Sequence, residues 1–473
     1  MSDYFATLES WVSAGNEFLW GPPMMIILIG FGIFATIYFG VPQVSIIKIG
    51  WNETFGQLFT REKTNREGSM SSFQSLATAI SAQVGTGNIA GVAGAILVGG
   101  PGAVFWMWMT ALVGMATIFV EAVLAQRYRR TRNGELVAGP AFYISQGLAE
   151  KNMVVLGKTL ASIFAVLIIL ALGFIGNMVQ SNSIASVMTE AFGIEPLIIG
   201  IGLGIVGGLV FIGGMKRIGK FAEMIVPVMA LIYFISAISI LFVFRSEIIP
   251  TIKSIFSEAF RMKAVTGGVA GYTIRSAVRY GVARGLFSNE AGMGSTPNSH
   301  GVADVPHPVV QGSVAMLGVF IDTMIVCSAT ALTILVSGAA DPNAGYEGAQ
   351  ITMEAFNRGF PGIGDKFLAI ALLFFAFTTV IGWYYFGEAN IKYLFKSNLA
   401  VRIYQILVIC FIVAGTLLQI GFVWELADLF NGLMVIPNVI GLIILATQAK
   451  SILKDYQNKN THDGLIHYEY PYE

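Results

Sequence analysis

The chain has 473 residues, of which 55% are hydrophobic and 12% are charged, and its mean hydropathy is +0.71. A soluble domain usually carries about 25% charged residues, so these values exclude an ordinary water-facing surface and predict extensive contact with membrane lipid. The 28 basic residues balance the 28 acidic residues, so no nucleic-acid partner is indicated. The four histidines lack metal-ligand spacing, and no cofactor is predicted.

Apolar stretches follow one another along the chain, and most have roughly the 20 residues that a membrane-spanning helix needs. We place ten spans at 21–40, 72–98, 101–126, 156–190, 196–214, 221–244, 308–337, 366–391, 399–419 and 422–448. An eleventh, broken span is expected within 264–305, where glycines accompany three arginines and a polar stretch. The sequence therefore predicts an all-α polytopic membrane protein with about 11 transmembrane helices.

Basic residues indicate how the spans are oriented, because cytoplasmic loops are enriched in lysine and arginine. With the N-terminus outside, the loops on the cytoplasmic side and the tail carry 19 basic residues, the outer loops carry six, and the broken span carries three. We therefore expect a multi-pass protein of the cell membrane with its N-terminus outside and its C-terminus in the cytoplasm.

The spans also divide into two sets of five after one leading helix. An odd number of spans in each set forces the two sets into opposite orientations, which makes them an inverted repeat. The expected parts are an N-terminal helix with an amphipathic cytoplasmic loop (1–71), the first repeat (72–244), an outer loop with the second repeat (245–448), and a cytoplasmic tail (449–473). The first span of each repeat is broken, and equal spacings of 13 residues, from Asn88 to Pro101 and from Ser295 to Pro308, suggest matched half-helices.

The sequence Val-Gly-Thr-Gly-Asn at 84–88 interrupts the second span. Two glycines two residues apart disfavour a continuous helix, and non-helical backbone survives in a membrane only inside protein or beside water. The half-helix that starts at Thr86, Gly87 and Asn88 would present free N–H groups to a carboxylate. The carbonyls between Ser81 and Gly85 would face a hard cation. A glycine-rich packing kink is the alternative.

Other polar residues within the spans have two readings each. Thr378 and Thr379 either bond to the preceding turn or complete a sodium shell of hydroxyl and carbonyl oxygens. Gln180, one turn after Asn177, either bonds to a neighbouring helix or contacts a substrate. Trp383 lies too deep for an interfacial belt and is either a core residue or the wall of a small pocket.

Four acidic residues lie within or near the spans, namely Glu121, Glu290, Asp322 and Glu388. A charge at the bilayer centre costs about 2.5–3.5 kcal/mol, so each must be paired, protonated or in contact with water. Asp322 is the deepest, and we consider it for ion coupling or proton sensing. A structural pair with an arginine of the broken span is an equal alternative.

Three motifs together resemble a known family. Ala82–Gly91 (AQVGTGNIAG), Gly99–Trp108 (GGPGAVFWMW) and Gly285–Ser295 (GLFSNEAGMGS) are similar to segments of the alanine-or-glycine:cation symporter family of prokaryotes. The resemblance extends over nearly the whole chain. It implies a leucine-transporter-like fold of ten core helices after one extra helix, with sodium or proton coupling. The first break also resembles the Val-Gly-x-Gly-Asn of neurotransmitter:sodium symporters.

The resemblance implies roles for individual residues. Thr86, Gly87 and Asn88 would hold the substrate carboxylate, Gln180 would contact the amino acid, and Phe287 and Trp383 would limit the pocket. The sodium ligands would be the carbonyls of Ser81, Val84 and Phe375 and the hydroxyls of Thr378 and Thr379.

These observations predict a secondary transporter that carries a small neutral amino acid, such as alanine or glycine, with Na⁺ or a proton by alternating access. A channel would need a continuous polar stripe, and an enzyme would need a catalytic cluster within the spans; the sequence shows neither. A membrane sensor that binds the amino acid without moving it is the alternative left open.

Overall fold

The computed structural model of the chain describes residues 2–56, 69–132, 134–260, 274–418, 420–462 and 468–472. Helices dominate these ranges, and one short antiparallel hairpin joins β1 (Arg130–Arg132) to β2 (Glu135–Val137) with Thr131 opposite Leu136. The first half contains α1 (Ser2–Leu19), α2 (Pro22–Tyr38), α3 (Pro42–Ser45), α4 (Ile47–Thr54), α5 (Ser72–Gln83), α6 (Val92–Gly99), α7 (Gly102–Arg127), α8 (Pro140–Glu150), α9 (Val154–Ile168), α10 (Asn177–Phe192), α11 (Pro196–Phe211) and α12 (Gly214–Val243). The second half contains α13 (Ile248–Glu258), α14 (Ile274–Asn289), α15 (Pro297–His300), α16 (Pro308–Val319), α17 (Ser328–Ser337), α18 (Ala349–Gly359), α19 (Gly364–Leu394), α20 (Asn398–Gly415) and α21 (Ile420–His462). Short π-helical segments, η2 (Ile169–Gly176) and η4 (Phe320–Cys327), join α9 to α10 and α16 to α17.

Among the described residues, eight helical segments are long and apolar enough to cross a membrane, and the bent pair α5 and α6 makes a ninth. This agrees with an all-α polytopic membrane protein. Two of the eleven predicted spans fall outside this set, because α11 has 16 residues and α14 is interrupted after Asn289. The count of eleven therefore stays a prediction.

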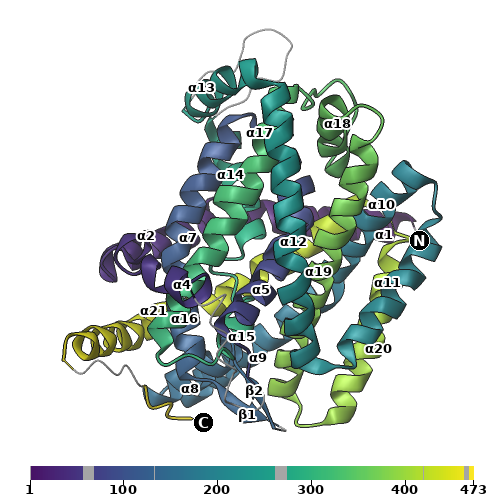
Figure 1. Cartoon of the computed structure of the whole chain (residues 1–473). Helices are drawn as coiled ribbons and strands as arrows, with labels where there is room; N and C mark the ends of the chain where they lie inside the picture. Colours follow the sequence, from purple (N-terminus) through teal and green to yellow (C-terminus); the bar gives the residue numbers. More distant parts are fainter. Residues whose placement is uncertain are drawn as a thin grey trace.

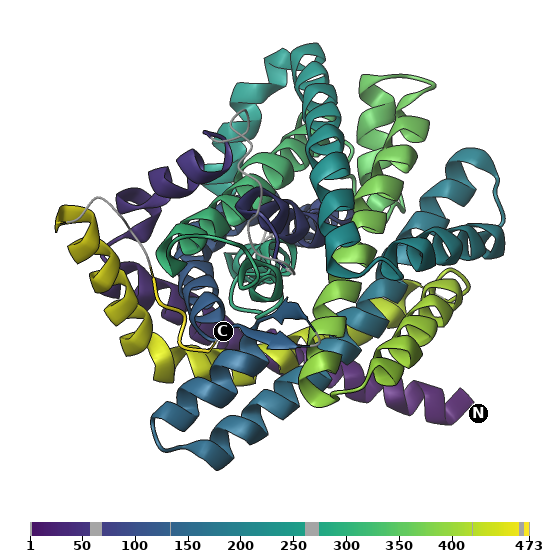
Figure 2. The same cartoon turned by 60° about the horizontal axis from the view of Figure 1, so that its bottom comes forward.

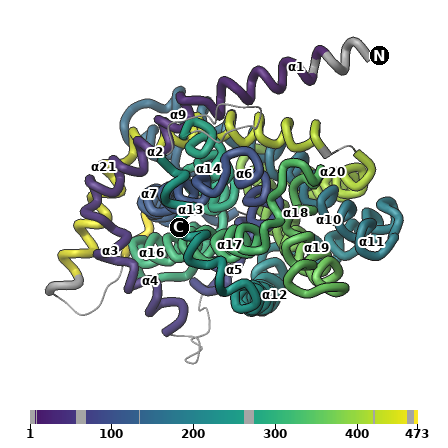
Figure 3. The backbone as a smooth tube through the Cα atoms, turned by 90° about the horizontal axis from the view of Figure 1, so that it is seen from above, coloured from purple at the N-terminus to yellow at the C-terminus, as the bar shows by residue number. Residues whose placement is uncertain are grey.

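The helices surround the broken span. Figure 1 shows α13 and α18 at one end of the molecule, and α8, β1 and β2 at the other, where the C-terminus also lies. We call these the α13 end and the α8 end. Figure 2 shows the C-terminus near the middle of the α8 end. In Figure 3, seen from the α13 end, α6 and α14 lie near the middle, α11 and α20 lie at the rim, and α1 projects from the body.

The burial pattern matches a helical bundle in lipid. Every residue of α5 except Phe73 and Gln74 is buried, whereas large apolar side chains on outer helices are exposed, among them Ile205 of α11, Met224 of α12 and Ile406 of α20. Apolar side chains that face hydrocarbon incur no hydration cost. The outer helices therefore form the lipid face and α5 lies in the interior.

Local sequence signals set the start and the end of α5. Ser71 caps its N-terminus: the Ser71 hydroxyl accepts from the Gln74 N–H at 3.1 Å, and the Gln74 side chain accepts from the Ser71 N–H at 3.2 Å. This reciprocal arrangement satisfies two N–H groups that the first turn leaves free. After Gln83 the helix stops, and its continuation, the π-helical turn η1 (Gly87–Gly91) followed by α6, is bent by 50°.

The second predicted break is present but differs from the first. Glu290 has φ +58°, Gly292 has φ +86° and Gly294 has φ +80°, so α14 cannot continue beyond Asn289. The prediction of matched half-helices is wrong, because only the four-residue helix α15 precedes the turns that lead to α16. Glycines at 292 and 294 suit positive φ and favour irregular turns over a second long half-helix.

Candidate functional site

The break between α5 and η1 redirects several backbone groups. The Gly85 N–H, which would bond to the Ser81 carbonyl in a continuous helix, instead donates to Gln83 O at 3.1 Å and to the Asn88 side-chain oxygen at 2.9 Å. The Asn88 N–H donates to Gly85 O at 3.3 Å rather than to Val84 O. The carbonyls of Ser81 and Val84 therefore lose their helical partners while remaining buried.

The predicted sodium ligands gather around these two carbonyls. The Thr379 hydroxyl lies 2.9 Å from Ser81 O, 3.3 Å from Val84 O and 3.1 Å from Phe375 O. A hydroxyl donates one hydrogen at a time, so Thr379 satisfies at most one of the Ser81 and Val84 carbonyls at any moment, whereas Phe375 O lies within the continuous helix α19. The result is a buried group of oxygens with too few donors, which is the environment that a hard cation prefers.

Thr378 joins the same group from the neighbouring position of α19. Its hydroxyl lies 2.9 Å from Phe375 O and 3.8 Å from the Met229 sulfur, two alternative acceptors for its hydrogen. The bond to Phe375 O is the one expected for a threonine that bonds to its own helix, while the bonds of Thr379 reach across to α5. The structure thus brings all five predicted sodium ligands together.

The predicted carboxylate-binding residues lie on the other side of the break. The Thr86 N–H donates to the Gln180 side-chain oxygen at 3.2 Å. The buried Thr86 hydroxyl has no hydrogen-bond partner among the described residues. An unpartnered buried hydroxyl can donate to an anionic group, and Gln180 of α10 contacts the same point through the Thr86 N–H. Asn177, in contrast, donates to Gly173 O of its own helix at 3.0 Å.

Two aromatic side chains close this side. Phe287 of α14 lies over Gly87, because a Cβ on Gly87 would be 3.2 Å from the Phe287 ring. The rings of Phe287 and Trp383 meet edge to face, with centroids 6.4 Å apart. Trp383 packs against Gly176, where a Cβ would come within 2.7 Å of its ring. The two rings therefore limit the space beside the break.

Asp322 reaches the first break through Asn88. The Asn88 amide donates to the Asp322 carboxylate at 2.6 Å while its oxygen accepts from the Gly85 N–H. Ser288 and Thr323 donate to the same carboxylate at 2.9 and 2.8 Å. The proposed pair of Asp322 with an arginine of the broken span is wrong for the described residues, because no salt bridge joins them and Arg284 pairs with Asp428 instead. Its three donors make Asp322 a buried acid held by neutral groups.

The other three acids have partners of their own. Glu290 accepts from the Trp383 indole at 2.6 Å, and Glu121 of α7 accepts from the Gly292 N–H at 3.1 Å and from the Asn438 side chain at 2.6 Å. Glu388 pairs with Lys392 at 2.6 Å. Two of these acids therefore hold the second break in place, and Glu290 also fixes the tryptophan beside the first.

Sequence reasoning missed some residues of this region. Ser288 bonds to Asp322, and Trp424 of α21 stacks near Phe287 with centroids 5.6 Å apart. Ser288 lies inside the motif Gly285–Ser295, whose polar stretch was the available signal. Trp424 has no such signal, because one tryptophan in an apolar span reads as core.

Comparisons with known proteins match nearly the whole chain. The profile of the sodium:alanine symporter family matches residues 5–468. The sodium/alanine symporter AgcS of Methanococcus maripaludis is 42% identical over 440 residues, which cover 92% of this chain and 94% of that protein. The putative sodium/proton-dependent alanine carrier protein YrbD of Bacillus subtilis is 41% identical, with 97% and 93% covered. The probable sodium/glutamine symporter GlnT of the same organism is 39% identical, with 97% and 93% covered.

Proposed function

Because the chain belongs to the sodium:alanine symporter family, we propose that it carries a small neutral amino acid, such as alanine or glycine, across the cell membrane together with Na⁺. One observation carries this proposal: the buried carbonyls of Ser81 and Val84, which share one hydroxyl, lie beside the unpartnered hydroxyl of Thr86 within one interrupted span. Such a break offers a cation and a carboxylate neighbouring places at mid-depth.

Each part of the break has a proposed role. Ser81, Val84, Phe375, Thr378 and Thr379 hold the sodium ion, and Thr86, Gly87 and Asn88 hold the carboxylate of the amino acid, with Gln180 as a further contact. Phe287 and Trp383 keep the pocket small, which favours alanine and glycine over larger side chains. Asp322 senses the ion through Asn88, because one amide joins the carboxylate to the broken backbone.

The transport cycle follows from this arrangement by alternating access. Sodium first satisfies the carbonyls of the break, the amino acid then binds, and two inverted five-helix repeats after one leading helix rock about the filled site. The excess of basic residues in the loops of the α8 end supports an outside location for the α13 end and the N-terminus. One Na⁺ with a zwitterion moves one net charge, so 100 mV adds about 2.3 kcal/mol of driving force.

Uptake by the purified protein in proteoliposomes tests the proposal. Labelled alanine and glycine should accumulate when Na⁺ is higher outside, and an inside-negative potential should raise the rate. A proton gradient without sodium should give little accumulation. Accumulation that ignores both gradients would refute coupled transport.

Counterflow separates transport from sensing. Liposomes loaded with unlabelled alanine should take up labelled alanine transiently against its gradient. A sensor would bind labelled alanine without counterflow. The relatives described above are named as symporters and carriers, which supports transport.

A further inference from the structure

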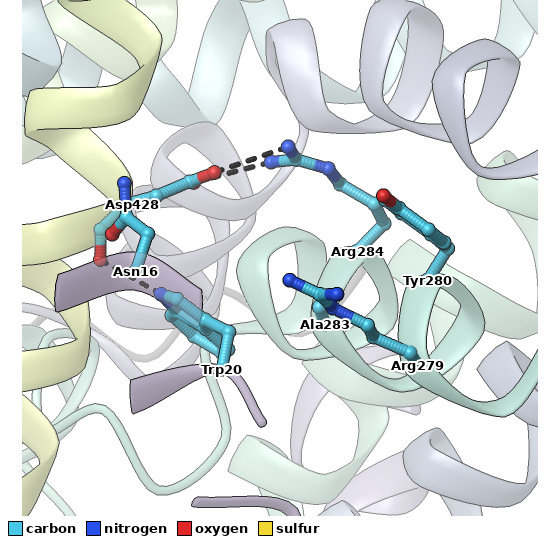
Figure 4. Close-up of a pocket in the computed structure, with 7 residues that line it drawn as sticks. All are labelled: Asn16, Trp20, Arg279, Tyr280, Ala283, Arg284 and Asp428. Atoms are coloured by element: carbon cyan, nitrogen blue, oxygen red, sulfur yellow. Dashed lines mark hydrogen bonds and ion pairs between the residues drawn. The ribbon is translucent and has the colours of Figure 1, made fainter. Parts of the chain in front are cut away.

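A small pocket lies on the α13 side of Phe287, away from the break. It has a volume of about 80 Å³ and is lined by residues of α1, α14 and α21 and by Trp20, which follows α1; the full set is Asn16, Trp20, Arg279, Tyr280, Ala283, Arg284 and Asp428. Figure 4 shows Asn16, Trp20 and Asp428 on one side of it, and the α14 residues on the other. Phe287 follows Arg284 by about one turn of α14 and Arg279 by about two turns. The pocket is thus separate from the site at the break.

An ion pair forms the part of the pocket nearest to Phe287. Arg284 binds Asp428 through two nitrogens and both carboxylate oxygens, each at 3.1 Å. The Arg284 guanidinium also lies 5.9 Å from the Phe287 ring centre and 5.5 Å from that of Trp424. A bidentate pair packed on two rings is geometrically well defined, so it makes a fixed floor between the pocket and the break.

Two groups that face this pocket are left without partners. Arg279 is half-buried and forms no ion pair or hydrogen bond in the part of the chain that the structure describes, apart from contact of its guanidinium with the Tyr280 ring at 5.6 Å. The Asn16 side-chain oxygen is buried and also lacks a partner there. Leaving such groups unsatisfied is unfavourable, so the pocket offers a free cation and a free acceptor at once.

The surroundings hold Asn16 in place. The Asn16 amide nitrogen donates to Glu425 O at 2.8 Å, and the Trp20 indole donates to Asp428 O at 2.9 Å. These bonds tie α1 and Trp20 to α21 at the wall of the pocket. A free guanidinium opposite an amide oxygen and a carboxylate matches a molecule that has one carboxylate and one ammonium.

We propose that this pocket is a second, outer binding site for a small α-amino acid. Arg279 binds its carboxylate, and the Asn16 oxygen with the Asp428 carboxylate receives its ammonium. The volume of about 80 Å³ admits a side chain the size of that of glycine or alanine and excludes large ones. The inference rests on the proposed function, because it supplies that transporter with a place where substrate waits before the Arg284–Asp428 pair opens.

Equilibrium binding of labelled alanine to the purified full-length protein tests the inference. We expect two classes of alanine-binding site in about 150 mM sodium, which is roughly physiological ionic strength. The first is a tight, sodium-dependent class at the break, and the second is a weaker class that persists without sodium. Arg279→Gln should weaken the second class at least about tenfold, the value of one charge-assisted hydrogen bond, and leave the first unchanged. Arg275→Gln is the matched control, because Arg275 is exposed one turn earlier on α14 and does not line the pocket.

The outcomes separate the two proposals. If wild-type protein binds alanine in one sodium-dependent class that Arg279→Gln leaves unchanged, the outer site is refuted and the transport proposal stands. If no sodium-dependent class exists, the transport proposal fails. Asn16→Leu alters the pocket from a different helix, so weak-class loss in this variant supports the site even if Arg279→Gln does not fold.

Discussion

Gly85 illustrates how one missing side chain shapes the break. A Cβ at this position would lie 2.4 Å from the Thr379 hydroxyl oxygen and 3.1 Å from the Gln180 side-chain oxygen. No real Cβ tolerates the first distance, so Gly85 is required for close approach rather than for unusual dihedral angles. The residue therefore lets α19 reach the carbonyls of α5 and lets α10 reach Thr86.

Gly85→Ala should disable the cation side of the break. The added methyl must displace the Thr379 hydroxyl, so the sodium concentration for half-maximal alanine uptake should rise at least about tenfold, which corresponds to about 1.4 kcal/mol. Gly94→Ala is the matched control, because it lies in the same broken span and its Cβ would meet no atom within 4 Å. Sodium titrations of uptake check both variants, and equal curves for the two would contradict the assigned role of Thr379.

His307 should make stability depend on pH. Burial lowers the pKa of His307 to about 4, although the Asp455 carboxylate 3.2 Å away favours the charged form and Lys459 opposes it. The unfolded chain takes up the proton near pH 6.5, whereas the folded chain does so only near pH 4. Stability is therefore complete above about pH 6.5 and falls between these two values as the pH decreases, by at most about 3 kcal/mol.

Thermal unfolding in detergent at pH 7.5 and pH 5 measures this effect. The wild-type protein should lose melting temperature at pH 5, and His307→Gln should lose distinctly less. The variant retains a side chain able to accept from the Val309 N–H, as His307 does at 3.2 Å. If both proteins show the same pH response, titratable groups other than His307 cause it.

At the scale of elements, the sequence predicts best the spans and their interruptions, because contact with lipid and backbone hydrogen bonding determine them. Long apolar runs fix the spans, and the glycines of residues 84–88 predict the interruption of α5 that the structure contains. The partners of isolated residues are harder to predict. Asp428 and Arg284 lie 144 positions apart, and hydrophobic periodicity carries no information about which spans are neighbours. The same limit explains why Asp322 was considered as a partner of an arginine.

The second break shows a related limit. Equal spacing to Pro101 and Pro308 suggested two similar half-helices, but positive φ at Glu290, Gly292 and Gly294 replaces the second one with turns. These turns are stabilised by bonds from other helices, among them those from Gly292 to Glu121 of α7 and from Asn438 of α21 to Gly292. A spacing rule cannot predict an irregular segment whose stability depends on another helix.

Glu121 variants test whether the second break depends on α7. Glu121→Leu leaves the buried Gly292 N–H without its acceptor and leaves the Asn438 amide with only the Gly292 carbonyl, and an orphaned buried donor costs about 1–3 kcal/mol. Glu121→Gln keeps one acceptor oxygen and has nearly the same shape. We expect the melting temperature to fall strongly in the leucine variant and about half as much in the glutamine variant. Equal melting temperatures for Glu121→Leu and the wild-type protein would show that the turns of the second break are stable without the bond to α7.

At the scale of the whole molecule, the chain closes its α8 end with its own last residues. Tyr468–Tyr472, which we call the tyrosine strap, joins three separate parts of this end. The Tyr468 N–H donates to Pro306 O at 3.0 Å, and the Arg129 guanidinium lies 3.7 Å from the Tyr470 ring centre. Tyr472 donates to Glu150 of α8 at 2.5 Å. The strap therefore connects the loop after the second break and the end of α7 to α8.

These contacts lie where an inner opening of the transporter must form if the α8 end faces the cytoplasm. Figure 2 shows the C-terminus near the middle of this end, beside the β1–β2 hairpin. Rocking of one group of helices against another would separate the loop at 303–307 and the end of α7 from α8. The strap joins parts that would separate in the proposed transport cycle, so in that cycle it would favour the conformation in which this end is closed.

Removal of residues 468–473 should loosen the α8 end. The truncation deletes several hydrogen bonds, such as Arg127 to the Tyr468 hydroxyl at 2.8 Å and Tyr470 to Val305 O at 2.9 Å, each worth about 1 kcal/mol. Two of them together shift an equilibrium by more than tenfold. Hydrogen exchange should therefore be at least about tenfold faster at the amides of 126–130 and 303–307, while α18 at the opposite end stays unchanged. A variant in which Tyr468, Tyr470 and Tyr472 are replaced by phenylalanine keeps the ring contacts. Its hydrogen-exchange rates should lie between those of the wild-type and the truncated protein. Unchanged protection after truncation would mean that α7 and the 303–307 loop hold this end closed without the strap, and the opening step would then have to depend on the breaks alone.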